Sequence, residues 1–165
     1  MKKFIFQKKR LNSSQRKICL DFFRKYTLTD EERKEVWKAR IGNKLKITKE
    51  LYHGLFSRLH SRSFPKKVDK LIRDDLDRTF PNCLTFEEGK RMYSKMHNLL
   101  RLFQLYRPDI GYIQGMTYII STLYYYFDEY ETFKCFCNLV ITNNFMRNMY
   151  TFNMKYVKNL SIYIF

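Results

Sequence analysis

The sequence lacks the cysteine patterns that mark zinc sites and disulfide frameworks. Its four cysteines include no Cys-x-x-Cys pair, and no cluster of histidines accompanies them. Because metal-binding and disulfide-stapled domains normally show such spacings, neither kind of domain is indicated. We expect reduced and mostly buried thiols at Cys19, Cys83, Cys135 and Cys137.

Long hydrophobic runs are also absent. The longest covers roughly residues 116–127 and is interrupted by Thr117, Ser121 and Thr122. A membrane-spanning helix needs about 20 apolar residues, so we expect a core helix here and no transmembrane segment. The N-terminus contains no apolar stretch of the kind found in secretory signal peptides, and secretion is not expected.

Nucleotide-binding and metal-binding motifs are missing as well. The sequence shows no Gly-rich loop followed by Lys-Ser or Lys-Thr, and no His, Asp and Glu residues at metal-ligand spacing. The histidines stand beside no Ser or Cys nucleophile in a recognisable arrangement. We expect them at the surface or at the edge of the core: His53, His60 and His97.

Acidic residues are scarce, with 16 Asp and Glu against 32 Lys and Arg, so the formal net charge is +16. Such an excess suggests an acidic partner, which could be nucleic acid, an anionic membrane or an acidic protein face. The joint abundance of Lys, Asn, Tyr, Phe and Ile is also what A/T-biased coding produces. No basic stripe interleaved with aromatic residues stands out on one helix face, and no nucleic-acid partner is expected.

What the chain does contain is a succession of helical patterns. Residues 29–32 (Thr-Asp-Glu-Glu) form a capping box, after which apolar residues recur at helical spacing until Gly42. Residues 85–88 form a second capping box, and Pro108 and Gly111 interrupt the long helix that it opens. Further helices are expected at about 51–59, 66–78 and 115–127, and from Asp128 onwards. Because no β-type alternation is evident, we predict an all-α fold.

The helix expected at 66–78 has a charged residue on its apolar face. Val68, Leu71, Ile72 and Asp75 fall on that face, and an unpaired buried carboxylate would be costly. Arg33 begins the apolar face of the helix after Thr29 and poses the same problem. The economical hypothesis is that Arg33 and Asp75 pair and so clamp the two helices together.

Two polar motifs stand out in this apolar and basic background. Residues 72–81 read Ile-Arg-Asp-Asp-Leu-Asp-Arg-Thr-Phe-Pro, and residues 106–116 read Tyr-Arg-Pro-Asp-Ile-Gly-Tyr-Ile-Gln-Gly-Met. They supply Arg78, at the end of its helix, and Gln114. In nucleotide hydrolysis an Arg neutralises charge on the transferring phosphoryl group and a Gln orients the attacking water. Taken singly, the two residues also fit a favourable helix C-terminus and an ordinary polar helix start.

Three motifs in order resemble the signature motifs of TBC domains, which are Rab GTPase-activating proteins. They are Arg33-x-x-x-Trp37, Ile72-x-x-Asp75-x-x-Arg78 and Tyr112-x-Gln114-Gly115. Each motif alone is weak, but agreement of all three in this order is improbable by chance. The likeness runs from about Thr29 to the end of the chain.

The resemblance implies a V-shaped all-α domain that docks on a GTP-bound Rab-type GTPase. Arg78 matches the family's arginine finger, and Gln114 matches its glutamine finger. Asp75 matches the residue that supports the arginine loop, and Tyr112 is expected to line the same surface. The structural members of the motifs are Arg33, Trp37, Ile72 and Gly115.

The resemblance also implies what the partner contributes. GTP and Mg²⁺ would belong to the GTPase, so we expect no cofactor and no metal site in this chain. Regulation of vesicle traffic, a cytoplasmic location and peripheral association with endomembranes through the partner are further expectations.

The expected organisation is a basic N-terminal extension over residues 1–25 and a TBC domain over residues 26–165. The N-terminal subdomain looks complete, whereas the C-terminal subdomain looks partial. A catalytically silent TBC-like scaffold that binds a Rab therefore stays open as an alternative. A basic membrane-surface or nucleic-acid binder is the third, and it predicts steep salt dependence.

Overall fold

The computed structural model describes residues 14, 27–61, 63–79 and 87–151. The chain divides into two compact units, Met1–Asn43 and Lys44–Phe165, and each is described by itself. The described residues form seven α-helices and no strand, which confirms the all-α prediction. The bounds expected for the N-terminal extension and the domain stay a prediction.

The first unit contains α3 (Asp30–Ile41), which begins and ends as the sequence predicts. The Thr29 hydroxyl accepts a hydrogen bond from the Glu32 amide at 3.2 Å, and the Glu32 carboxylate accepts one from the Thr29 amide at 3.2 Å. This reciprocal capping box satisfies two amides at the helix start. Gly42 ends the helix at a positive φ of 65°, a conformation that favours glycine.

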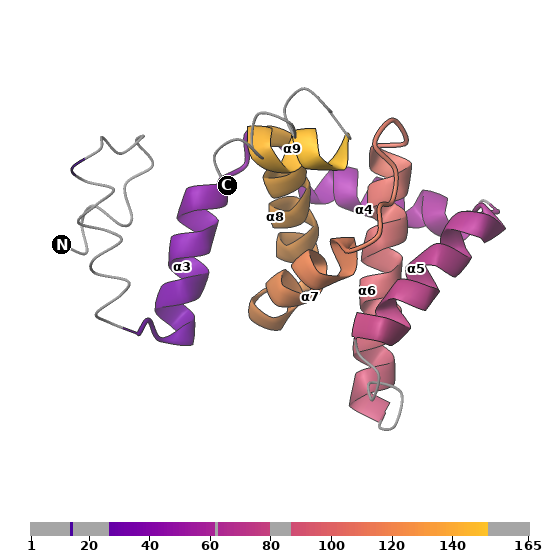
Figure 1. The fold of residues 1–165 in the computed structure, drawn as a ribbon, viewed down its shortest axis with the longest axis horizontal. Helices are drawn as coiled ribbons and strands as arrows, with labels where there is room; N and C mark the ends of the chain where they lie inside the picture. Colours follow the sequence, from indigo (N-terminus) through magenta and orange to yellow (C-terminus); the bar gives the residue numbers. More distant parts are fainter. Residues whose placement is uncertain (1–13, 15–26, 62, 80–86, 152–165) are drawn as a thin grey trace, which may run out of the picture. The chain divides into compact units, whose positions relative to one another are not determined.

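The second unit is a bundle arranged around α6. It comprises α4 (Lys49–Ser61), α5 (Lys66–Thr79), α6 (Glu87–Tyr106), α7 (Met116–Tyr126), α8 (Glu129–Thr142) and α9 (Asn144–Tyr150). In Figure 1, α6 runs through the middle of this unit, and it packs against α4, α5, α7 and α8. The helix α9 packs on α8.

The core of the second unit is built from α4, α5, α6, α7 and α8, each of which contributes buried apolar residues. Along α6 a stripe of residues at helical spacing is buried, namely Gly89, Tyr93, Met96, Leu100 and Phe103. The rings of Phe103 and Phe136 meet edge to face with their centroids 5.0 Å apart, an arrangement that aromatic pairs favour. The predicted start of α8 is confirmed, since Asp128 caps it by accepting from the Glu131 amide at 2.8 Å.

The buried face of α5 differs from the predicted one by part of a turn. Ile72 and Asp75 are buried as expected, but Leu71 is 49% exposed and Leu76 is fully buried. Val68 is only half-buried. The pattern was ambiguous because leucines flank the Ile72–Asp75 stripe on both sides, and packing against α6 and α7 selects the Leu76 side.

Several other expectations can be compared with the described residues. The helix α9 was not predicted, although Asn143 caps it by accepting from the Met146 amide at 3.2 Å. Cys135 and Cys137 are buried free thiols, as expected. Cys19, Cys83 and the capping box at 85–88 lie outside the described residues. Within the described ranges, none of the helices is both long enough and apolar enough to cross a membrane.

His97 is buried, with 5% of its surface exposed, rather than at the surface or the core edge, which corrects the prediction for this residue. Its Nε2 lies 2.9 Å from an Asp69 oxygen, and Arg101 Nε lies 3.5 Å from the same oxygen. Burial lowers the pKa of His97 below its ordinary value of 6.5; Asp69 opposes this effect, and Arg73 and Arg101 add to it. Loss of hydration therefore outweighs the carboxylate.

This buried imidazole predicts a loss of stability in mild acid. As the pH falls through about 6.5, the unfolded chain protonates His97, whereas the folded chain does so only at lower pH. The unfolded state then binds more protons, so the free energy of unfolding decreases. We expect urea unfolding to show a larger decrease between about pH 7.5 and about pH 5.5 for the wild type than for His97→Gln. Equal decreases would contradict a neutral buried His97.

Candidate functional site

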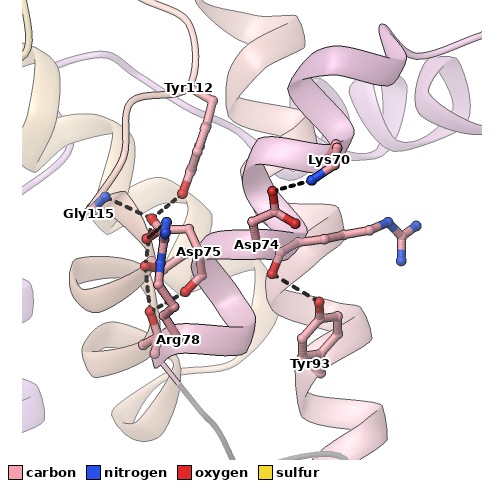
Figure 2. Close-up of polar contacts among 10 residues, drawn as sticks. Lys70, Asp74, Asp75, Arg78, Tyr93, Tyr112 and Gly115 are labelled. Atoms are coloured by element: carbon pink, nitrogen blue, oxygen red, sulfur yellow. Dashed lines mark hydrogen bonds and ion pairs between the residues drawn. The ribbon is translucent and has the colours of Figure 1, made fainter.

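The candidate site is centred on Asp75, whose side chain is only 4% exposed near the C-terminal end of α5. One carboxylate oxygen, Oδ2, accepts hydrogen bonds from the Tyr112 hydroxyl, from the Gly115 amide at 2.8 Å and from the Thr117 hydroxyl at 3.1 Å. Figure 2 shows Tyr112 and Gly115 approaching this carboxylate from the segment ahead of α7. A charge on the buried face of α5 is therefore satisfied by a distant loop.

The other oxygen of Asp75 holds Arg78, one turn further along α5. Arg78 Nη2 donates to Oδ1 at 3.3 Å, while 59% of the Arg78 side chain stays exposed. Figure 2 shows the guanidinium folded back towards Asp75. One carboxylate thus joins an exposed arginine on α5 to the loop before α7.

Burial raises the pKa of the Asp75 carboxyl, but hydrogen bonds to its oxygens outweigh that effect, and the pKa lies below its ordinary value. The donors, in order of effect, are Tyr112, the Gly115 amide, Thr117 and Arg78. Burial and the bond to Asp75 in turn raise the pKa of Tyr112, so the phenol keeps its proton and donates. The cluster therefore holds an ionised acceptor among protonated donors.

The loop that carries Gln114 runs from the end of α6 to the start of α7. Its first turn follows Pro108, with the Ile110 and Gly111 amides donating to the Arg107 carbonyl at 3.2 and 2.8 Å. Its last turn ends at Gly115, which precedes α7 at a φ of 91°. Gln114 itself is exposed. A left-handed glycine at this point lets the chain turn into α7 directly after Gln114.

Two threonines reinforce the junction between α5 and α7. The hydroxyls of Thr79 and Thr117 lie 2.8 Å apart, and Thr79 also donates to the Asp75 carbonyl at 2.8 Å. Thr117 is fully buried. The last turn of α5 and the first turn of α7 are consequently in contact through these two hydroxyls, which both also lie within hydrogen-bond distance of Asp75.

A second anchor, on α6, holds the same end of α5. The Tyr93 hydroxyl donates to Asp77 Oδ1 at 2.9 Å and contacts the Arg73 carbonyl oxygen at 3.3 Å. Figure 2 shows Tyr93 on the side of α5 away from Tyr112 and Gly115. The turn before Arg78 is therefore held from two sides.

The predicted site residues fall into two groups. Asp75, Arg78, Tyr112 and Gly115 come together at one carboxylate, with Gln114 next to Gly115 and Ile72 fully buried one turn before Asp75. Arg33 and Trp37 lie on α3 in the other unit, where Arg33 donates to the Leu28 carbonyl at 3.5 Å. The proposed Arg33–Asp75 pair stays a prediction, and the partners named above already account for the burial of Asp75.

Sequence reasoning missed three polar residues of this site: Thr79, Thr117 and Gln104. Thr79 was visible in the motif after Arg78, but its partner is 38 residues away. Gln104 accepts from the Tyr112 amide across eight residues and a turn. No local pattern signals such contacts, since they depend on how the helices pack.

Among residues 14, 27–61, 63–79 and 87–151, no group of three or more His, Cys, Asp or Glu side chains is placed to hold a metal ion.

Comparison with known proteins points in the same direction as the motifs. A family model described as the Rab-GTPase-TBC domain matches residues 30–165. The chain is 34% identical to TBC1 domain family member 12 of Rattus norvegicus over 66% of this chain and 18% of that protein. The chain is also 34% identical to TBC1 domain family member 14 of Homo sapiens, over 66% of this chain and 18% of that protein.

A more distant relative carries a functional name. GTPase-activating protein GYP3 of Saccharomyces cerevisiae is 28% identical over 71% of this chain and 20% of that protein. The chain thus spans about a fifth of the length of the curated relatives that it matches.

Proposed function

Because this chain belongs to the Rab-GTPase-TBC domain family, we propose that it accelerates GTP hydrolysis by a Rab-type small GTPase. It binds the GTP-loaded form and acts as an activator of the partner, which holds GTP and Mg²⁺. Arg78 and Gln114 are the proposed catalytic residues. The proposal includes a cytoplasmic location and a role in vesicle traffic, with peripheral membrane association through the partner.

The observation that carries the proposal is the shared carboxylate of Asp75. One oxygen binds Arg78, and the other binds the amide of Gly115, which directly follows Gln114. Both candidate catalytic side chains are exposed. The buried Asp75 carboxylate binds the Arg78 side chain itself, and it binds the backbone amide that directly follows Gln114. Such an arrangement lowers the entropy lost when two polar groups are brought to one reacting centre.

The two side chains have complementary chemistry for phosphoryl transfer. A guanidinium stays protonated at all relevant pH values and presents a planar set of donors, which suits the negative charge that builds on the γ-phosphoryl oxygens. A carboxamide offers both an acceptor and donors, so Gln114 can orient a water molecule for attack. Neither step requires a nucleophile from this chain.

The proposal is tested by single-turnover hydrolysis with a panel of GTP-loaded Rab proteins. We expect this chain to accelerate hydrolysis by at least one of them in proportion to its concentration, and to bind that Rab more tightly in the GTP form than in the GDP form. Binding without acceleration would replace the proposal by the scaffold alternative. Neither binding nor acceleration across the panel would contradict both.

A further inference from the structure

Gln104 lies on α6, yet its side chain reaches the loop that carries Gln114. Its Oε1 accepts a hydrogen bond from the Tyr112 amide at 2.6 Å, and the residue is half-buried. Tyr112 lies two positions before Gln114. The side-chain amide of Gln104 therefore binds the backbone of the loop at Tyr112, whereas Asp75 binds it at the Gly115 amide.

The loop approaches Gln104 closely because residue 111 is a glycine. Gly111 has a φ of 71°, and a Cβ atom built there would lie 3.1 Å from Gln104 Oε1. The positive φ and the missing side chain together allow the chain to pass over this amide. Gly111 therefore leaves room for the Gln104 side chain. A larger residue at position 111 would push Gln104 Oε1 away from the Tyr112 amide.

The two attachments enclose Gln114 within a short span. The Tyr112 amide is held by Gln104 and the Gly115 amide by Asp75, so only residues 113 and 114 lie between the two held positions. The Ile113 amide also points inward, to Met116 Sδ at 3.4 Å. With backbone donors fixed on both sides, the Cα of Gln114 has little freedom, and its exposed side chain starts from a defined position.

We propose that Gln104 is a positioning residue for Gln114, which it orients through the Tyr112 amide. This inference rests on the proposed function, in which Gln114 orients the attacking water. Gln104 acts on the rate of the bound complex and not on docking, because its acceptor faces the loop backbone. Displacing a catalytic group by about 1 Å costs on the order of 100-fold in rate, so loss of this attachment is expected to be visible in kcat.

The test compares two substitutions of similar length. Gln104→Glu keeps an acceptor oxygen for the Tyr112 amide, whereas Gln104→Met keeps the length and loses the oxygen. We expect Gln104→Met to lower kcat for stimulated hydrolysis on the order of 10-fold to 100-fold with KM for the GTPase unchanged. Gln104→Glu should stay close to the wild type. Thermal unfolding of both variants shows whether each remains folded at the assay temperature.

A second readout does not depend on activity. Amide hydrogen exchange at Tyr112 should accelerate in Gln104→Met and not in Gln104→Glu, because only the methionine leaves that N–H without its acceptor. In the Gln114→Ala background, Gln104→Met should cause little further loss of kcat, since the group that it positions is already gone.

The outcomes separate the two proposals. If the wild-type chain accelerates hydrolysis and Gln104→Met does so equally, the role of Gln104 is wrong and the proposed function stands. The role of Gln104 is also overturned if the loss appears in KM alone, or if it is undiminished in the Gln114→Ala background. If the wild-type chain accelerates no GTPase, the proposed function fails, and the catalytic role of Gln104 fails with it.

Discussion

Replacing Arg78 by alanine is expected to lower stimulated GTP hydrolysis by about 10³-fold to 10⁵-fold, the range attributed to arginine fingers. The physical reason is that the other side chains bound to Asp75, those of Tyr112 and Thr117, are neutral and cannot offset negative charge on the phosphoryl group. The measurement is the single-turnover rate at saturating activator with the GTPase that responds to the wild-type chain. Arg78→Lys should remain far below the wild type, since an ammonium group lacks the planar set of donors.

The fold is expected to tolerate this substitution. Arg78 Nη2 lies 3.3 Å from Asp75 Oδ1, and the Arg78 side chain is 59% exposed. Exposed ion pairs contribute about 0–1 kcal/mol. A large loss of rate with an unchanged unfolding midpoint would therefore locate the effect in the chemistry. Arg91→Ala is the matched control, because Arg91 is an exposed arginine on α6 outside the cluster. A rate for Arg78→Ala within a few-fold of the Arg91→Ala rate would refute the assignment.

Replacing Asp75 by alanine is expected to cause the largest loss of stability of any single substitution in the site. It removes the acceptor of the Tyr112 hydroxyl, the Gly115 amide and the Thr117 hydroxyl. Thr117 is fully buried and the other two donors are half-buried. A buried donor left unsatisfied costs about 1–3 kcal/mol and a half-buried one less, so the total is on the order of 4 kcal/mol. Urea unfolding followed by circular dichroism measures this change as a lower midpoint.

Asp74 provides the matched control for Asp75 because it is the adjacent residue with the same side chain. Its carboxylate pairs with Lys70 at 2.7 Å, and both side chains are substantially exposed, 44% for Asp74 and 76% for Lys70. Asp74→Ala should therefore change the free energy of unfolding by less than about 1 kcal/mol. If the two substitutions lowered the free energy of unfolding equally, the hydrogen bonds of Asp75 would contribute no more to stability than the exposed ion pair of Asp74.

Asp75→Ala is also expected to reduce stimulated hydrolysis under conditions where the variant remains folded. It releases both Arg78 and the loop end at Gly115, so the two proposed catalytic side chains lose a common support. Because residues that act as a unit are not additive, combining Asp75→Ala with Arg78→Ala should lower the rate by less than the product of the separate losses.

Helix boundaries in this chain were predictable because they depend on neighbouring residues. Thr29 and Glu32 cap each other across three positions, and Asp128 caps α8 in the same local way. Pro108 and Gly111 mark the end of α6 for the same reason, since their effects on φ do not require tertiary contacts. The short helix α9 escaped prediction because Asn143 and Asn144 precede too few apolar residues to form a recognisable stripe.

The buried face of α5 and the partner of Asp75 were less predictable. Leu71 and Leu76 flank the same apolar stripe, and only packing against α6 and α7 decides that Leu76 is buried and Leu71 is exposed. The need of Asp75 for polar partners followed from its place on the apolar face. The identity of those partners did not, because Tyr112, Gly115 and Thr117 are 37 to 42 residues away.

The amino-acid sequence by itself therefore determined the helices other than α9, the caps at Thr29 and Asp128, and the two motifs that contain Arg78 and Gln114. The tertiary structure alone decided that both motifs meet at one carboxylate, and that Gln104 on α6 binds the loop of the second motif at the Tyr112 amide. The physical reason is the sequence separation over which each interaction acts. Capping and helical periodicity act over three or four residues, whereas the hydrogen bonds of Asp75 and Gln104 form only after α5, α6 and α7 have packed together.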